Sequence, residues 1–273
     1  MIRVSRGVEP ASPAPVRHSR LATLRALGRP PVSTDIDGYQ VVAKDLWSRK
    51  HCKCCYCEAR IQLAYNDVEH YRPKTEADRT PGCVRKHGYW WLAYTWDNLI
   101  FACPSSNRSG KNVRFPLAAG ATSLTDEKMP PGRELPLLID PGSFIDPVAH
   151  IVFVYKRSTP TSGSSEWFAE PRGGSVLGAY TIEICKLNRD ELIELRRLHF
   201  ETAVEPIVEE LETALNINDQ DALFLAHKRA TALFKPKNVH VGLAYDALRA
   251  RTKNARLHAS LGAKWPPPSK VGI

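Results

Sequence analysis

Residues 68–74 read VEHYRPK and residues 96–107 read WDNLIFACPSSN, and these two stretches decide the fold and the chemistry expected of the chain. They carry an adjacent glutamate and histidine, two asparagines and a cysteine. The cysteine-rich block CCYCE at 54–58 precedes them, and Lys111 follows them. Thiols, an imidazole and oxygen-bearing side chains gathered in one window are typical of metal-dependent sites.

The cysteines of this window have the spacing of a zinc site with one position changed. Cys54 and Cys57 form a CxxC pair. Cys103 stands where a second pair would begin, but Ser106 replaces its second thiol, and neutral serine is a poor zinc ligand. Another side chain completes the site or the site has decayed; alternatively, the cysteines are small buried hydrophobic residues. The candidates for a fourth ligand are His51, Cys52, Cys55 and Cys83.

Glu69 and His70 are adjacent, so on a strand their side chains point to opposite faces and can do different work. A carboxylate suits a hard divalent ion such as Mg²⁺, and a neutral imidazole suits a general base. An isolated pair of this kind is more often a surface feature. Asn98 and Asn107 follow in order, and their amide oxygens favour a metal-dependent site over that alternative.

The pieces C-x-x-C, E-H-x-x-P-K, W-x-N-L and C-x-x-S-N-x-x-x-K together resemble an HNH (ββα-metal) endonuclease with zinc knuckles. Longer stretches extend the resemblance beyond the nuclease motif. They include YWWLAYTWDNLIFAC, ELPLLIDPGSFIDPVAHIVF and TIEICKLNRDELIELRR, and they are similar to the HNH effectors of Septu-type and retron-associated antiphage systems. The similarity covers residues 35–210, which is most of the chain.

The resemblance implies a role for each matched side chain. His70 matches the general base that activates water, and Glu69 and Asn107 match ligands of the catalytic ion. Asn98 matches the middle position of the motif, which orients the loop and the base. The remaining matches, at basic positions near the scissile phosphate, are Lys74, Lys111 and Arg72.

The resemblance also implies cofactors and a partner. These are Mg²⁺ or another divalent ion at the catalytic site, structural Zn²⁺ on Cys54, Cys57 and Cys103, and an ABC/SMC-like ATPase subunit. The implied reaction is hydrolysis of phosphodiester bonds in nucleic acid, with DNA expected, in bacterial antiphage defence. The alternative is a non-catalytic zinc-knuckle subunit that binds nucleic acid or acts as a scaffold in a defence complex.

Composition indicates a folded protein, and its basic C-terminal segment either binds nucleic acid or is a solvated tail or helix face. Of the 273 residues, 43% are apolar, and the net charge is +9, which excludes a disordered chain. No segment reaches the roughly 20 apolar residues of a membrane helix, and no secretory signal is evident, so we expect a cytoplasmic protein. The charge is +5 over 45–117, −7 over 181–223 and +9 over 224–273, so the acidic stretch is the part least suited to phosphates.

The expected fold class is α+β, with a small ββα-metal HNH core and zinc knuckle embedded in a predominantly helical chain. The expected regions are a 1–44 N-terminal extension with a short helix, a 45–117 HNH nuclease core, a 118–180 loop-rich connection with a β-hairpin, and a 181–273 helical C-terminal region.

Periodicity and end signals predict individual elements. The resemblance implies one strand ending at His70 and a second at 98–102. The residue pattern predicts a hairpin of 150–156 with 166–171 across a turn at 159–165. The predicted helices are 19–28 with a Ser19 cap, 38–50, 180–216 divided at Pro206, 219–234, and 241–262. The aromatic segment 89–96 is predicted to pack in the core rather than stack on bases.

Overall fold

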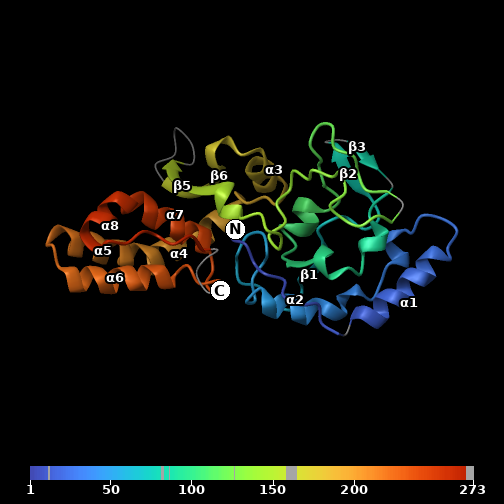
Figure 1. The fold of residues 1–273 in the computed structure, drawn as a ribbon, viewed down its shortest axis with the longest axis horizontal. Coiled ribbons are helices and arrows are strands. Elements are labelled where there is room, and N and C mark those ends of the chain that lie inside the picture. Colours follow the sequence, from blue (N-terminus) through green and yellow to red (C-terminus); the bar gives the residue numbers. More distant parts are fainter. Residues whose placement is uncertain (12, 81–82, 86, 126, 158–164, 269–273) are drawn as a thin grey trace.

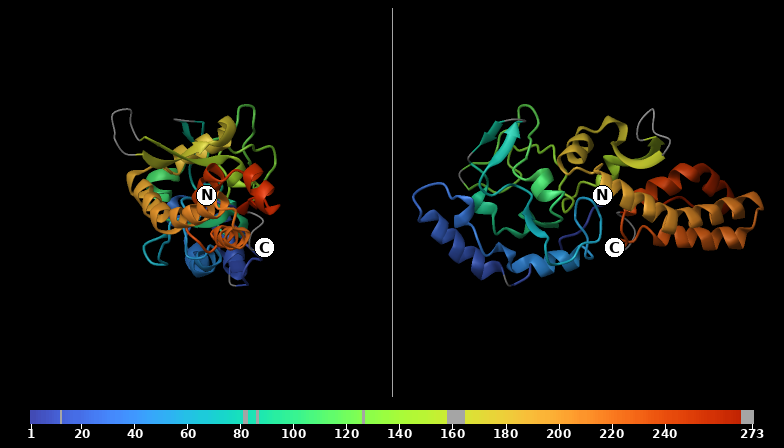
Figure 2. Two further views of the ribbon diagram at one scale, coloured as in Figure 1. Left: turned by 90° about the vertical axis from the view of Figure 1, so that its left-hand side faces the viewer. Right: turned by 180° about the vertical axis from the view of Figure 1, so that it is seen from behind.

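The computed structural model describes all residues except 12, 81–82, 86, 126, 158–164 and 269–273. Side chains at 13–15 and 83–85 are also outside the described part. The molecule is elongated, with α1 at one end and the pair α5 and α6 at the other (Figure 1). The view from behind shows the N-terminus between these two parts (Figure 2), where Met1 and Ile2 are buried.

The part that contains α1 carries two small antiparallel sheets. β1 pairs with β4 so that Asp67 faces Ala102 and His70 faces Leu99, and a π-helical turn at Asn107–Lys111 follows β4. The expected strand at 98–102 is therefore confirmed except at its first residue, because Asn98 ends a 3-10 turn at Trp96–Asn98. The elements of this part are α1 (Pro13–Arg25), α2 (Ala43–Arg49), β1 (Asp67–His70), β2 (Ala77–Thr80), β3 (Cys83–Arg85) and β4 (Leu99–Ala102).

The other part is one β-hairpin covered by helices. Its strands pair from Ile151 with Pro171 to Arg157 with Ser165, which confirms the predicted hairpin. Of the predicted turn at 159–165, residues 159–164 lie outside the described part, and Ser165 belongs to β6. The elements are β5 (Ile151–Arg157), β6 (Ser165–Pro171), α3 (Val176–Ile184), α4 (Asp190–His199), α5 (Glu205–Asn216), α6 (Gln220–Ala232), α7 (Val241–Arg251) and α8 (Asn254–Leu261).

Two of the predicted helices differ from the structure. The first helix begins at Pro13, so Ser19 lies inside α1 and its prediction as a cap is wrong. The Pro- and Ala-rich start misled the sequence interpretation, although proline is well tolerated in a first helical turn. The helix predicted at 241–262 is divided into α7 and α8 by Thr252 and Lys253, both extended.

One other helix prediction is confirmed in part and another in full. Pro206 lies in the first turn of α5, and the π-helical turn Phe200–Val204 separates α5 from α4, as the division near Pro206 predicted. The break between α3 and α4 at 185–189 was not predicted. Asp219 caps α6, since its side chain accepts a hydrogen bond from the backbone N–H of Ala222.

A shared hydrophobic core joins the two parts. One buried cluster includes Phe115 and Ile139 together with Leu211 and Leu248. The aromatic segment 89–96 belongs to the interior as predicted, since four of its rings are buried and only Trp90 is half-buried. The chain is thus a mixed α and β structure with small sheets, and each helix in the described part is too short or too polar to span a bilayer.

Candidate functional site

A cavity of about 400 Å³ opens beside β1 and collects the side chains that the sequence singled out. Glu69 and His70 come from the end of the strand, and Asn107 comes from the turn after β4. The pairing of β1 with β4 holds these two segments together. Residues that line the cavity include Tyr39, Asp67, Glu69, His70, Lys74 and Asn107.

The contacts of His70 determine which nitrogen of its ring carries the proton. The side chain is buried, and Nε2 lies 2.9 Å from the carbonyl oxygen of Ala93. A carbonyl oxygen only accepts, so Nε2 carries the proton and Nδ1 keeps a lone pair. Burial lowers the pKa of His70 to about 3, with a further contribution from Lys74. The imidazole is therefore neutral at physiological pH, and its Nδ1 lone pair is unprotonated.

Glu69 is held by a buried cation. The Lys111 ammonium lies 2.6 Å from Glu69 Oε1 and 2.8 Å from the carbonyl oxygen of His70. Burial raises the pKa of Glu69, and the charge and hydrogen bond of Lys111 oppose that rise. Lys111 is completely buried and is not among the residues that line the cavity, so it contacts the carboxylate from within the protein.

The two asparagines occupy different surroundings. The buried Asn98 ties down the loop after β1, because its Oδ1 accepts from the N–H of Arg72 at 2.8 Å and its Nδ2 donates to the carbonyl oxygens of Arg72 and Leu92. Asn107 reaches the cavity and donates from Nδ2 to Asp67 Oδ2 at 3.1 Å. Asn98 therefore bonds backbone, whereas Asn107 bonds a carboxylate.

Asp67 is a site residue that the sequence interpretation missed. It lies two positions before Glu69, so on β1 the two carboxylates share one face. Arg108 and Asn107 both donate to it. Because strand residues two positions apart share a face, counting back two residues from Glu69 would have identified Asp67.

Two basic side chains predicted near the scissile phosphate differ in exposure to the cavity. Lys74 lines it, and its Nζ donates to the hydroxyl of Tyr39 at 3.1 Å and lies 4.2 Å from the centre of that ring. Arg72 is directed elsewhere, since its Nε donates to the buried carboxylate of Glu134 at 2.8 Å.

The donor set of the cavity fits a hard divalent ion. Asp67 and Glu69 offer carboxylate oxygens and Asn107 offers an amide oxygen, which are the ligand types that Mg²⁺ prefers. Lys111 already compensates part of this negative charge. An ion at this site would therefore share Glu69 with an ammonium group.

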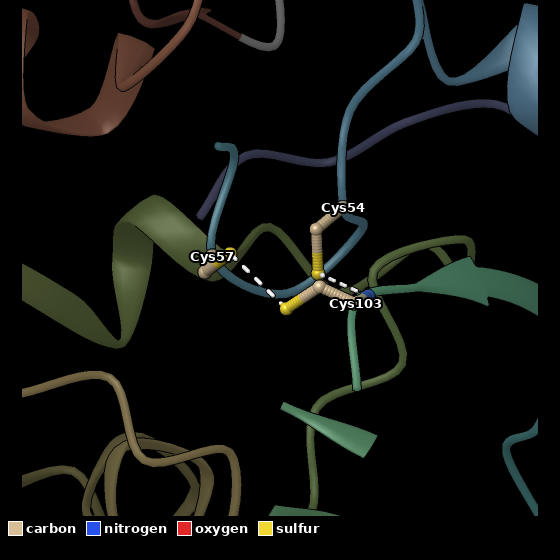
Figure 3. Close-up of side chains that lie close together, drawn as sticks. All are labelled: Cys54, Cys57 and Cys103. Atoms are coloured by element: carbon tan, nitrogen blue, oxygen red, sulfur yellow. Dashed lines mark hydrogen bonds between the residues drawn. The ribbon is translucent and has the colours of Figure 1, made fainter. Parts of the chain in front are cut away.

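The three cysteines predicted as zinc ligands converge in the structure (Figure 3). Their sulfur atoms lie within 4.8 Å of one another, and Sγ of Cys57 and Cys103 are 3.8 Å apart. The backbone N–H of Cys103 donates to Cys54 Sγ at 3.4 Å. Burial opposes ionisation of Cys54, but its hydrogen bonds with Cys103 and Cys55 outweigh burial and lower its pKa. The buried cluster could hold a metal such as zinc.

Ser106 and an unpredicted arginine occupy the fourth side of the cluster. Ser106 is fully buried, with Oγ 3.4 Å from Cys103 Sγ. Arg189, from the segment between α3 and α4, donates to Ser106 Oγ at 3.3 Å and to the sulfurs of Cys57 and Cys103 at 3.6 and 3.7 Å. No spacing rule links residue 189 to this cluster, so sequence patterns alone could not identify it.

The predicted candidates for a fourth zinc ligand are not in the cluster. Among the described side chains, the group that could hold a metal contains three cysteines and excludes His51, Cys52 and Cys55. The side chain of Cys83 lies outside the described part. A metal here would have three thiolates, with a serine hydroxyl and a guanidinium beside them.

Comparisons with known proteins relate the chain to one group. It is similar to Septu protein PtuB of Bacillus mycoides (strain KBAB4), with 33% identity over 147 residues, which cover 53% of this chain and 45% of the relative. It is also similar to Septu protein PtuA of the same strain, with 30% identity over 145 residues, which cover 53% of this chain and 18% of the relative. The matched segments thus span less than half of either relative. No protein-family model matches, and no solved structure matches.

Proposed function

We propose that the chain is a metal-dependent HNH endonuclease that hydrolyses phosphodiester bonds of nucleic acid, with DNA as the expected substrate. The observation that carries the proposal is the cavity beside β1. It places a neutral histidine with a free Nδ1 lone pair next to two carboxylates and an amide oxygen. General-base and metal-ligand groups are thus adjacent, as hydrolysis of a phosphodiester requires.

The residues of the cavity divide the work. His70 Nδ1 takes a proton from the attacking water, and the Ala93 carbonyl holds the ring in the required tautomer. Glu69 and Asn107, with Asp67 beside them, would hold Mg²⁺, which when bound stabilises charge on the phosphate and on the leaving 3′ oxygen. Lys74 lines the same cavity and attracts the phosphate.

Two further side chains act by positioning. Asn98 fixes the loop that follows the histidine, through hydrogen bonds to the backbone of Arg72 and Leu92. Lys111 fixes the Glu69 carboxylate and opposes the rise in its pKa that burial causes. Zinc on the three cysteines would join the 54–57 loop to the end of β4 and so support the hairpin that carries the site.

The biological setting follows from the relatives. Similarity to proteins named PtuB and PtuA supports a component of a Septu antiphage system that works together with a second subunit. We place an ABC/SMC-like ATPase in that second role. The competing hypothesis is a non-catalytic subunit that binds nucleic acid or acts as a scaffold.

A cleavage assay separates the two hypotheses. Supercoiled plasmid is incubated with the purified chain in Mg²⁺ or in EDTA, and Asn107→Ala serves as the metal-site variant. The nuclease hypothesis predicts nicking that requires Mg²⁺ and is strongly reduced in the variant. Binding of plasmid without nicking in Mg²⁺, by the chain alone and with its ATPase partner, would support the non-catalytic subunit.

A further inference from the structure

A second and larger cavity lies beside the candidate active site. Its volume is about 1190 Å³, and its walls come from the end of α1 and the loop after it, from β2, from the turn at Trp90, and from the loop at 117–127. Lys74 and Thr75 line both cavities, so the two are neighbours. A polymer with one bond in the smaller cavity would have the larger one beside it.

The described side chains that line this second cavity include more basic than acidic groups. Among its described lining residues Glu127 is the only acid. The basic lining residues are Arg25, Arg29, Lys74, Arg79 and His87. A concave surface of one charge sign concentrates ions of the opposite sign, so this surface suits a polyanion.

Arg25 and Arg29 can exchange their present carboxylate partners for a phosphate at little cost in free energy. Arg25 pairs with Glu127 at 2.7 Å and Arg29 pairs with Asp35 at 2.7 Å, and both guanidinium groups are about half exposed. Exposed ion pairs contribute only about 0–1 kcal/mol, so a phosphate can replace the carboxylate with little penalty. Glu127 is the group that opposes a phosphate at this place.

Two tryptophans line part of the second cavity, and one of them is held by a hydrogen bond. Trp90 and Trp91 both line the cavity, with their rings nearly perpendicular and 6.1 Å apart. Trp91 is anchored, because its Nε1 donates to the carbonyl oxygen of Lys128 at 2.9 Å. Trp91 is buried, whereas Trp90 is half-buried, so Trp90 is the ring more accessible to a base.

We propose that this second cavity binds single-stranded nucleotides that flank the scissile phosphate, an inference that rests on the proposed nuclease function. Single strands bind where basic side chains follow the backbone and aromatic rings contact the bases. Sequence-specific readers of duplex DNA insert a helix or a β-ribbon into a groove, whereas this site is a concave surface. The second cavity therefore selects substrates with an unpaired segment beside the cleaved bond.

The test measures binding in EDTA, where no cleavage occurs, by fluorescence anisotropy of a labelled single-stranded DNA oligonucleotide and its duplex. The double variant Arg25→Gln/Arg29→Gln should weaken single-strand binding roughly tenfold and reduce the salt slope by about 1.4, the value for two lost phosphate contacts. Glu127→Gln should tighten binding. Arg20→Gln is the matched control, since Arg20 lies on the same helix in an exposed pair with Asp37 and does not line the cavity.

The outcomes distinguish this inference from the proposed function. Loss of binding in the double variant, at an unfolding midpoint equal to that of Arg20→Gln, supports the second cavity even when plasmid cleavage is absent. Equal affinities of the double variant and Arg20→Gln overturn the inference, and normal Mg²⁺-dependent cleavage in the same samples leaves the nuclease assignment intact. Tighter binding of the duplex than of the single strand also overturns it.

Discussion

Replacement of Lys111 by methionine tests how the candidate catalytic carboxylate is held. The ammonium is fully buried, 2.6 Å from Glu69 Oε1 and 2.8 Å from the carbonyl oxygen of His70. Methionine has a similar length but no charge, so Glu69 remains as a buried carboxylate without its cation. Removal of one partner from a buried ion pair lowers the free energy of unfolding by about 3–5 kcal/mol.

The pH dependence of this loss has a definite sign. Burial already raises the pKa of Glu69, and Lys111 opposes the rise, so Lys111→Met should raise it further. At pH values between the pKa of Glu69 in the unfolded chain and its higher pKa in the folded variant, the native state binds more protons than the unfolded chain. Stability therefore falls as pH rises through that window, by up to ~1.4 kcal/mol per unit. The loss should therefore be smaller at acidic pH than at neutral or alkaline pH.

Urea unfolding of four proteins at about pH 5 and about pH 8 provides the assay. The double variant Glu69→Gln/Lys111→Met removes both charges and should regain at least half of the lost stability. Lys44→Met, at an exposed lysine, should change stability by no more than about 0.5 kcal/mol. A loss below about 1 kcal/mol in Lys111→Met at about pH 8, or an equal loss in the double variant, refutes the role given to this ion pair.

Three further predictions concern other sites. Ser106→Cys supplies a fourth thiol beside Cys103 and should tighten zinc binding, measured in competition with a chelator. The control is Ser105→Cys, at the half-buried neighbouring serine. Equal zinc affinities of the two variants would contradict a zinc site at this cluster. Asp67→Asn should raise the Mg²⁺ concentration needed for half-maximal cleavage by about 10–100-fold, and an unchanged requirement would remove Asp67 from the metal site. Burial lowers the pKa of His240 to about 3, so the native state binds fewer protons than the unfolded chain below pH ~6.5. Stability should therefore fall as pH drops from about 6.5 toward about 3, by up to ~1.4 kcal/mol per unit, and His240→Gln should flatten that dependence in urea unfolding.

Local patterns predicted the elements with clear alternation or helical periodicity. The β5–β6 hairpin has alternating apolar and polar residues, and α5 and α6 carry a Pro206 start and an Asp219 cap. The β2–β3 pair was missed, because ADRT at 77–80 has no apolar alternation and is too short to recognise. Such strands form only because the surrounding chain supplies their partners.

The candidate site was predictable to the extent that it is local. Glu69, His70 and Asn107 are matched by a motif, and the antiparallel pair of β1 and β4 brings them to one cavity. The contacts of Lys111 and Arg189 were not predictable, since they depend on how a turn and a distant helix pack. Sequence therefore identified the chemical groups, whereas the structure supplied the counter-charges that hold them.

The most direct test of the central claim is the rate of Mg²⁺-dependent plasmid cleavage by His70→Ala. Nδ1 of this histidine is assigned as the base, and a positioned base contributes about 10²–10⁴-fold to rate. The account predicts a loss of that size, with nucleic-acid binding close to that of the unaltered chain and folding confirmed by circular dichroism. Cleavage by His70→Ala at the rate of the unaltered chain would contradict it.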